Sequence, residues 1–212
     1  MKIFLDSANI SEIKEMKELN LVDGITTNPT LLAKEGKDSI KIIREISKII
    51  DGPIHVEPVS TSVNDIIKES EEFSKISKNI VIKIPFIKEG IKAVKILSER
   101  GIKTNFTLIF SANQAILSAK IGSNYVTPFV GRLDDGTQYG TNLIKEIVKI
   151  YKNYSFKTEV LAASIRTPLH VLEVALSGVD IVTVPKSVLE LMIKHPLTDL
   201  GVKKFIDDWK KK

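Results

Sequence analysis

The sequence predicts a single-domain α/β protein, a (β/α)8 TIM barrel followed by an extra C-terminal helix. Short apolar runs alternate with longer segments of helical period along the whole 212-residue chain. There are eight such runs, so each strand-helix unit takes about 26 residues, at the small end of the range for this barrel. The alternative is an open doubly wound sheet, which usually has a glycine-rich first turn. Here that turn reads Asp6-Ser7-Ala8-Asn9, which favours the barrel.

The strand candidates are runs rich in β-branched residues, several of them apolar on both faces. That pattern is typical of parallel strands covered by helices. In order, the candidates are Lys2–Asp6, Val22–Asn28, Ile54–Val59, Ile80–Phe86, Lys103–Ile109, Tyr125–Val130, Thr158–Ala163 and Ile181–Val184.

Between these runs, apolar residues recur every three or four positions, which predicts amphipathic helices. The clearest stripes are Ile40, Ile43, Ile46 and Ile50, and Ile144, Ile147, Val148 and Tyr151. Predicted helix starts are Asn9 with Glu12, Ser111 with Gln114, and Ser187 with Glu190, and predicted stops are Gly101, Gly122 and Gly178. We expect one domain over residues 1–212, in which residues 199–209 form an additional amphipathic helix ending at Trp209.

The composition indicates a globular protein, with 43% hydrophobic residues and mixed charges. No apolar stretch approaches the roughly 18 residues of a membrane span. Asp6 interrupts the apolar N-terminus too early for a signal peptide, so we expect a cytoplasmic protein. The net charge of +5 is spread among glutamates, without an aromatic-interleaved basic patch, so neither a nucleic acid nor a membrane is an expected partner. The absence of cysteine excludes thiol nucleophiles.

Lys83 lies in the apolar stretch Asn79–Pro85, which contains most of the predicted strand Ile80–Phe86. An unpaired ammonium buried in such a sheet tends to lose its proton, and a neutral lysine amine can form a Schiff base with a carbonyl substrate. Lys83 is therefore the first candidate for chemistry. The alternatives are an edge or surface lysine, or one that pairs with a nearby carboxylate.

Polar residues gather where the first five predicted strands end, which is where the active site of such a barrel lies. They are Asp6, then Thr26, Thr27 and Asn28, then Glu57, then Lys83, and then Asn105 and Thr107. Two carboxylates flanking an amine suit a carbon-carbon lyase, in which the amine attacks a ketone and the carboxylates move protons. Taken singly, Asp6 and Asn28 could instead cap helices, and Thr107 could be an ordinary strand residue.

Two of the four arginines, Arg132 and Arg166, directly follow the sixth and seventh strands. Arginine binds phosphate bidentately, and such barrels often hold phosphate near their last strands. These two residues, with Ser164, therefore predict a phosphorylated substrate. Lys186, after the eighth strand, is a weaker candidate that we interpret as a surface residue.

Histidine offers a rival chemistry, because His55 and Glu57 share a strand face. A metal-dependent aldolase needs several converging histidines, and His170 and His195 fall in or after helices. We therefore expect no metal and no other cofactor, and interpret His55 as a hydrogen-bonded interior residue.

The chain resembles the small transaldolase family, which includes the fructose-6-phosphate aldolases. The likeness is carried, in order, by Phe4–Ala8, Gly24–Thr30, Val81–Pro85, Thr104–Thr107, Pro128–Arg132 and Ala162–Pro168. These short motifs are spread over nearly the whole chain, and their joint occurrence is highly specific.

The resemblance implies a role for each residue of the site. Lys83 is expected to form the Schiff base, Asp6 to be the acid/base for carbon-carbon cleavage, and Glu57 with Thr107 to hold the proton-shuttling water. Asn28 and Asn105 are expected to bind the dihydroxyacetone hydroxyls, and Arg132, Arg166 and Ser164 the phosphate. Thr26, Thr127 and Phe129 complete the expected substrate-binding set. The family also commonly forms rings of five paired into decamers, so a homo-oligomer is expected.

Two positions divide this family. Its transaldolases resemble this chain in carrying Glu at position 57 and Phe at position 129, whereas the free dihydroxyacetone aldolases carry Gln and Tyr. Phe129 is expected to keep the enamine dry until an acceptor aldehyde arrives. Thr127 departs from the pattern, since transaldolases more often carry serine there.

The sequence therefore predicts a transaldolase that moves a dihydroxyacetone unit from a ketose phosphate, sedoheptulose 7-phosphate or fructose 6-phosphate, to glyceraldehyde 3-phosphate or erythrose 4-phosphate. The nearest alternative is a lyase that releases free dihydroxyacetone from fructose 6-phosphate. More distant alternatives are a barrel isomerase with Glu57 or Asp6 as base, and a sugar-phosphate binding module without turnover.

Overall fold

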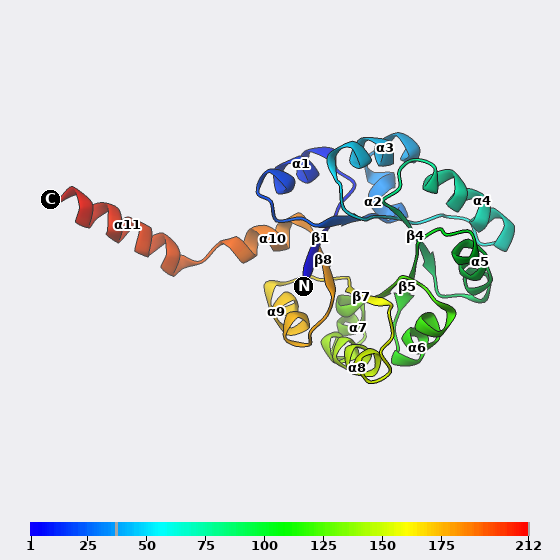
Figure 1. Ribbon diagram of the computed structural model, residues 1–212. Helices are drawn as coiled ribbons and strands as arrows, with labels where there is room; N and C mark the ends of the chain where they lie inside the picture. Colours follow the sequence, from blue (N-terminus) through cyan, green and yellow to red (C-terminus); the bar gives the residue numbers. More distant parts are fainter. Residues whose placement is uncertain (37, 212) are drawn as a thin grey trace.

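The computed structural model describes residues 1–36 and 38–211 and confirms the predicted barrel. Eight parallel strands follow one another around the ring, and β1 closes it by pairing with both β2 and β8 (Figure 1). The strands are β1 (Lys2–Asp6), β2 (Gly24–Thr26), β3 (Ile54–Val56), β4 (Ile80–Pro85), β5 (Thr104–Ile109), β6 (Tyr125–Pro128), β7 (Glu159–Ala162) and β8 (Ile181–Val184). Each lies within its predicted run.

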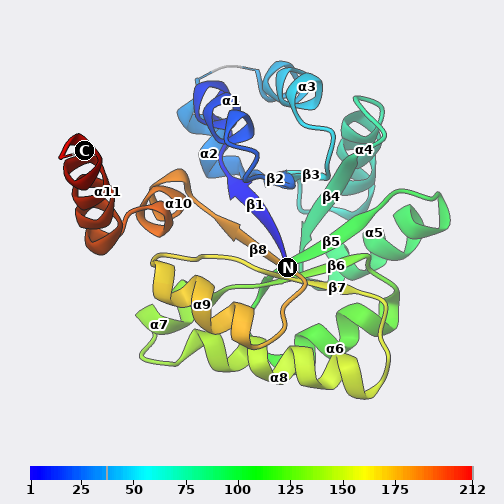
Figure 2. The same ribbon diagram turned by 60° about the vertical axis from the view of Figure 1, so that its left-hand side comes forward.

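Helices surround the barrel and cover its outer surface, except for the last one, which extends away from it (Figure 2). They are α1 (Ile10–Glu18), α2 (Pro29–Lys34), α3 (Ser39–Ile49), α4 (Val63–Ser74), α5 (Lys88–Glu99), α6 (Ala112–Ile121), α7 (Val130–Asp135), α8 (Gly140–Asn153), α9 (Pro168–Leu176), α10 (Lys186–Ile193) and α11 (Pro196–Lys210). The predicted stripes on α3 and α8 are confirmed at their central positions, because Ile43, Ile46, Ile144 and Ile147 are all fully buried against the barrel. Ile40, at the start of the α3 stripe, is exposed instead.

Two of the three predicted helix starts are confirmed. Asn9 and Ser111 are N-cap residues whose side chains accept backbone N–H groups of α1 and α6. The start at Ser187 is wrong, because α10 begins directly after β8 at Lys186, with Pro185 as its N-cap and no side-chain cap. Pro185 already holds the extended geometry that precedes a helix, so the turn needs no hydroxyl.

The interior of the barrel changes character along the strands. A lower layer of inward side chains is apolar and packs as one cluster with members Phe4, Val81, Tyr125, Leu161 and Ile181. Residues two positions further on share the same face, and they are Asp6, Lys83, Thr127, Ala163 and Thr183. Two residues along each of these strands, the inward side chains therefore change from an apolar lower layer to a mainly polar layer at the C-terminal mouth.

α11 projects away from the barrel in Figures 1 and 2. None of its residues, all of which lie in the described part of the chain, is buried. Large apolar side chains are exposed along it, including Leu197, Phe205 and Trp209. An amphipathic helix of this kind is left with an uncovered apolar face.

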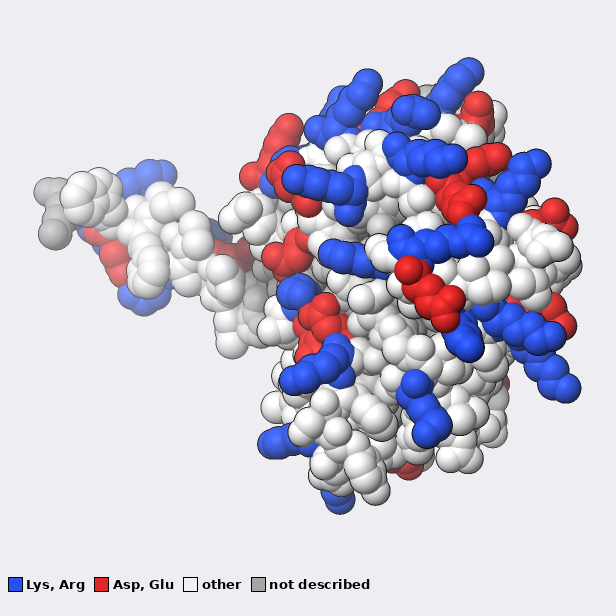
Figure 3. All heavy atoms as spheres, turned by 45° about the vertical axis from the view of Figure 1, so that its right-hand side comes forward, with Lys and Arg blue, Asp and Glu red and all other residues white. Residues whose placement is uncertain are grey.

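On the face of the molecule drawn in Figure 3, lysines and arginines are interspersed with acidic residues rather than gathered by sign. Within the described residues, no helix is both long and apolar enough to cross a bilayer.

Candidate active site

Lys83 lies on β4 at the C-terminal mouth of the barrel, with only 4% of its surface exposed. Its Nζ donates to the carbonyl oxygen of Thr27 at 2.8 Å and lies 3.1 Å from Oε2 of Glu57. The interpretation as an edge or surface lysine is therefore wrong, and so is the premise that the buried ammonium is unpaired. Glu57 is the carboxylate that makes its burial tolerable, and it is also a base within reach of the amine proton.

Asp6 ends β1 on another side of the same opening. Its Oδ1 accepts a hydrogen bond from Oγ1 of Thr26 at 2.7 Å. Burial raises the pKa of Asp6, although the charge of Lys83 and the Thr26 hydrogen bond act in the opposite direction. A carboxyl group with a raised pKa is better suited to exchange protons than a fully exposed one.

A cavity of about 140 Å³ opens at this end of the barrel. It is lined by Asp6, Thr26, Asn28, Lys83, Thr127, Phe129, Arg132, Ala163, Ser164 and Thr183. A second, more open cavity of about 350 Å³ adjoins it and contains Glu57, and the two share Asn28, Lys83, Phe129 and Arg132. Residues from opposite sides of the barrel thus surround the Lys83 amine.

Asn28, Phe129 and Arg132 form the wall shared by both cavities. Asn28 is also the N-cap of α2, because its Oδ1 accepts the N–H of Leu31 at 2.9 Å, which leaves its amide NH2 to face a ligand. The guanidinium carbon of Arg132 lies 5.0 Å from the centre of the Phe129 ring. This cation–π contact holds the arginine beside the opening.

Asn105 lies beneath the cavity rather than in its wall, and it is completely buried. Its Oδ1 accepts from Oγ1 of Thr127 at 2.8 Å, and its Nδ2 lies 2.8 Å from Nδ1 of His55. Asn105 therefore orients Thr127, which does line the cavity. Two residues further along β5, Thr107 is equally buried, and its hydroxyl has no hydrogen-bond partner among the described residues.

The predicted phosphate residues are placed differently from one another. Ser164 lines the cavity in a left-handed conformation, with φ of 59°, and its carbonyl oxygen accepts the N–H of Gly131 at 2.9 Å. Arg166 is not among the residues lining either cavity. It forms a bidentate ion pair with Asp135 instead.

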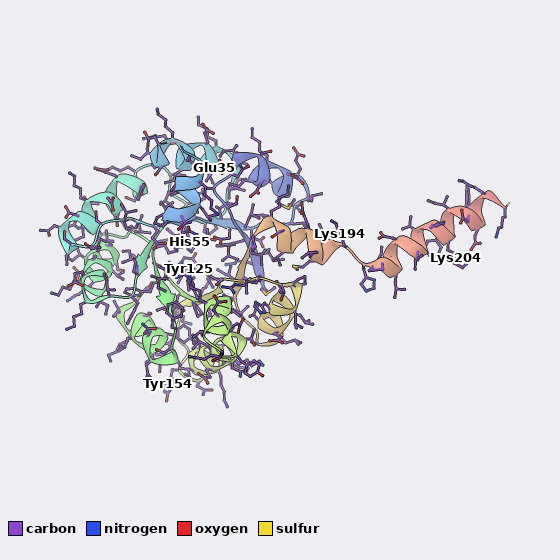
Figure 4. The ribbon with its side chains drawn as sticks, turned by 180° about the vertical axis from the view of Figure 1, so that it is seen from behind. Glu35, His55, Tyr125, Tyr154, Lys194 and Lys204 are labelled. Atoms are coloured by element: carbon purple, nitrogen blue, oxygen red, sulfur yellow. The ribbon has the colours of Figure 1, made fainter. Side chains whose placement is uncertain are left out.

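His55 is an interior residue, as predicted, and Figure 4 shows it near Tyr125 in the middle of the ring of helices. It packs edge-on against Phe4 and Tyr125, and burial lowers its pKa to about 3. The described residues contain no group of three potential metal ligands. Lys186 pairs with Glu15 on α1 and does not line the cavities.

Sequence reasoning missed several cavity-lining residues, among them Thr183 and Leu108. Thr183 on β8 lines the cavity and lies 2.6 Å from the hydroxyl of Thr26, but a lone threonine in an apolar strand gives no signal of function. Leu108 lines the outer cavity at an irregular point of β5. Its φ is positive, at 57°, and the β5–β6 register shifts between Phe106 and Ile109. Irregularities of this kind are frequent beside active sites.

A buried primary amine, two carboxylates and several hydroxyl groups thus lie around two adjoining cavities, both of which Lys83 lines. This donor set can attack a carbonyl carbon, move protons on and off the adduct, and hold a polyhydroxylated ligand. An arginine and a serine at the rim add groups that can bind an anion.

Comparison with known proteins agrees with this chemistry. The sequence profile of the Transaldolase/Fructose-6-phosphate aldolase family matches residues 3–212. The chain is 57% identical to a probable transaldolase of Caldicellulosiruptor saccharolyticus over 212 residues, which cover the whole chain and 98% of that protein. It is 56% identical to probable transaldolases of Thermodesulfovibrio yellowstonii and Clostridioides difficile, over at least 99% of this chain and 97% of theirs. Since these similarities span the full barrel and the cavity described above, the chain belongs to the transaldolase/fructose-6-phosphate aldolase family of enzymes.

Proposed function

We propose that the protein is a transaldolase that carries a dihydroxyacetone unit on Lys83 as a Schiff base, from a ketose phosphate to an aldose phosphate. The observation that carries this proposal is the buried Lys83 amine, 3.1 Å from Glu57 in a cavity that Asp6 also lines. Burial makes the amine a reactive group rather than a solvated surface charge, and the carboxylates supply the proton transfers that the reaction requires.

Imine formation begins when the ammonium of Lys83 loses a proton to the Glu57 carboxylate beside it. The neutral amine attacks the ketone carbon, and the carbinolamine then loses its hydroxyl as water, which requires a proton. Glu57 can return that proton through a water molecule held against Thr107. The buried, unpartnered hydroxyl of Thr107 supports this arrangement, because ordered water commonly satisfies such groups.

Carbon-carbon cleavage follows when Asp6 removes the proton of the hydroxyl on the departing carbon of the bond that breaks, which becomes the aldehyde carbon of the product. The electron pair of that bond moves into the protonated imine, giving an enamine on Lys83, and the aldose phosphate leaves. An acceptor aldehyde then reacts by the reverse of these steps, with Asp6 returning the proton. The raised pKa of Asp6 favours both halves of this exchange.

The remaining residues are proposed to hold the sugar. The amide of Asn28 and the hydroxyls of Thr26 and Thr127 face the cavity and are placed to bind hydroxyl groups of the dihydroxyacetone unit. Asn105 takes part through the hydrogen bond that orients Thr127. The substrates proposed are sedoheptulose 7-phosphate or fructose 6-phosphate as donor, and glyceraldehyde 3-phosphate or erythrose 4-phosphate as acceptor.

The phosphate is proposed to bind at the rim, where Arg132 and Ser164 line the inner cavity. Arg166 is included because it lies two residues beyond Ser164, on the same loop. Its side chain must exchange partners to take part, because Asp135 holds both ends of its guanidinium.

Transfer is favoured over release of free dihydroxyacetone by Phe129, which contributes a ring rather than a hydroxyl to both cavities. The test is product formation from fructose 6-phosphate with and without an acceptor aldehyde. The protein should form product only with acceptor, and Phe129→Tyr should raise acceptor-independent release of dihydroxyacetone. Phe110, whose ring packs on Phe129 at 5.7 Å, provides the matched control, since Phe110→Tyr should leave the balance unchanged. Equal release with and without acceptor by the unmodified protein would identify the lyase instead.

We also propose that the chain forms a homo-oligomer, a decamer by resemblance to its family. The support is the uncovered apolar face of α11, which has a stable place only against another surface. Light scattering should give the mass of ten chains, and removal of residues 196–212 should reduce it.

A further inference from the structure

Asp135 holds the arginine that the sequence predicts to bind phosphate. Nη1 of Arg166 donates to Oδ1 of Asp135, and Nη2 donates to Oδ2 at 2.5 Å. This is the fork-to-fork geometry in which arginine also binds phosphate, so the carboxylate occupies the position that a phosphate needs. The Arg166 guanidinium holds the pKa of Asp135 below its ordinary value.

Arg132, which lies on α7 together with Asp135, differs from Arg166 in its contacts. It lines both cavities and lies over the Phe129 ring, and it forms no ion pair within the described part of the chain. Its charge nevertheless reaches Asp135, where it also lowers the pKa of the carboxyl group. Asp135 therefore interacts electrostatically with both Arg132 and Arg166, but among the described residues only Arg166 donates hydrogen bonds to it.

The local backbone fixes the two partners relative to each other. Gly131 donates to the carbonyl oxygen of Ser164, and a Cβ at Gly131 would lie only 2.6 Å from Nε of Arg166. The Arg166 side chain therefore crosses closely over the start of α7, where only glycine leaves room for it. Arg166 lies two residues beyond Ser164, which lines the inner cavity, while its guanidinium is turned to Asp135.

We propose that Asp135 competes with the substrate's phosphate for Arg166 and thereby limits how tightly the enzyme holds a phosphorylated sugar. The inference rests on the proposed sugar-phosphate function and adds to it a residue that sets the affinity for phosphate. A phosphate monoester carries about −1.5 to −2 charges at neutral pH and offers three acceptor oxygens, so it can displace a single exposed carboxylate. A neutral sugar cannot, and Arg166 then stays neutralised by Asp135.

The experiment is a calorimetric titration of inorganic phosphate into the full-length protein and into Asp135→Asn, Arg166→Met and the double variant. Asp135→Asn should bind phosphate about two- to fivefold more tightly, the modest size expected from an exposed ion pair. In the Arg166→Met background, the same substitution should give no gain, because Asp135 acts through Arg166. Glu71→Gln, which removes a similar exposed partner from Arg100 elsewhere, is the matched control and should leave the affinity unchanged.

Unchanged or weaker phosphate binding by Asp135→Asn would overturn the inference, since Asp135 would then only orient Arg166. An equal gain in the Arg166→Met background, or in Glu71→Gln, would also overturn it, because the effect would be one of net charge. None of these measurements requires turnover. Failure of the transaldolase proposal would instead appear as a lack of transfer in every variant, whatever the phosphate affinities.

Discussion

The hydroxyl of Thr183 on β8 lies 2.6 Å from the hydroxyl of Thr26 on β2, inside the barrel. Thr26 Oγ1 is also 2.7 Å from Oδ1 of Asp6. A hydroxyl has one proton and an ionised carboxylate only accepts, so Thr26 donates to Asp6 and Thr183 donates to Thr26. This directed chain ends on the proposed acid/base of carbon-carbon cleavage.

Thr183→Val should therefore change the proton affinity of Asp6 without touching it. The hydrogen bond from Thr26 lowers the pKa of Asp6. Loss of the Thr183 donor weakens that hydrogen bond, so the pKa of Asp6 should rise. The acidic limb of the pH profile of kcat/KM should move to higher pH, with kcat/KM lower by about tenfold. Thr183→Ser keeps the donor and should restore the profile. An unshifted profile in Thr183→Val would show that Thr183 does not act through Asp6.

Thr107→Val should separate activity from stability. The Thr107 hydroxyl is buried and unpartnered among the described residues, so its removal should leave the free energy of unfolding unchanged or raise it by about 1 kcal/mol. The rate of imine formation, measured by quenching with borohydride, should fall by about 10²-fold or more, because the relay water is lost.

Thr104 offers the matched control for this substitution. It is a buried threonine at the start of β5, away from both cavities, and its hydroxyl is also unpartnered among the described residues. Thr104→Val should change stability in the same direction and leave the rate unchanged. A normal rate of imine formation in Thr107→Val would remove Thr107 from the mechanism.

His55 should make the protein less stable in mild acid. Burial lowers its pKa to about 3, whereas in the unfolded chain it is about 6.5, so below pH 6.5 the unfolded state binds a proton that the folded state does not. The stabilisation is complete above pH 6.5 and is lost as the pH falls toward 3. Its loss at pH 5 relative to pH 7 is about 2 kcal/mol, to be measured by urea unfolding.

Asp6 acts in the opposite sense, since its raised pKa makes the folded state bind a proton more readily at low pH. The comparison of the protein with His55→Gln isolates the histidine, and the variant should lack about 2 kcal/mol of this pH dependence. Equal pH dependence in the two proteins would contradict the assignment.

The sequence was informative where a periodic pattern repeats. Eight strands and their order follow from alternating apolar runs, since local chain geometry alone determines each run. The short helices α2 and α7 were not predicted, because six residues are too few to show a period. The start of α10 was misplaced because Ser187 and Glu190 fit a capping pattern that Pro185 makes unnecessary.

For the site, residue type and strand position brought most of the expected residues to the mouth of the barrel. A carboxylate beside Lys83 was among the expectations, since Glu57 follows the neighbouring strand. The Thr183 partner of Thr26 and the Asp135 partner of Arg166 were beyond prediction, because these contacts depend on how side chains meet in the folded barrel. Each alters the electrostatics of a residue that the sequence had already singled out.

The central claim, a covalent link between substrate and Lys83, is tested most directly by borohydride reduction in the presence of fructose 6-phosphate, followed by peptide mass spectrometry. The predicted result is one reduced dihydroxyacetone unit on Lys83. The adduct should persist in Lys186→Met, which changes another strand-end lysine, and should be lost in Lys83→Met together with about 10³-fold or more of the turnover. Undiminished turnover by Lys83→Met, or an adduct on a different lysine, would contradict the account.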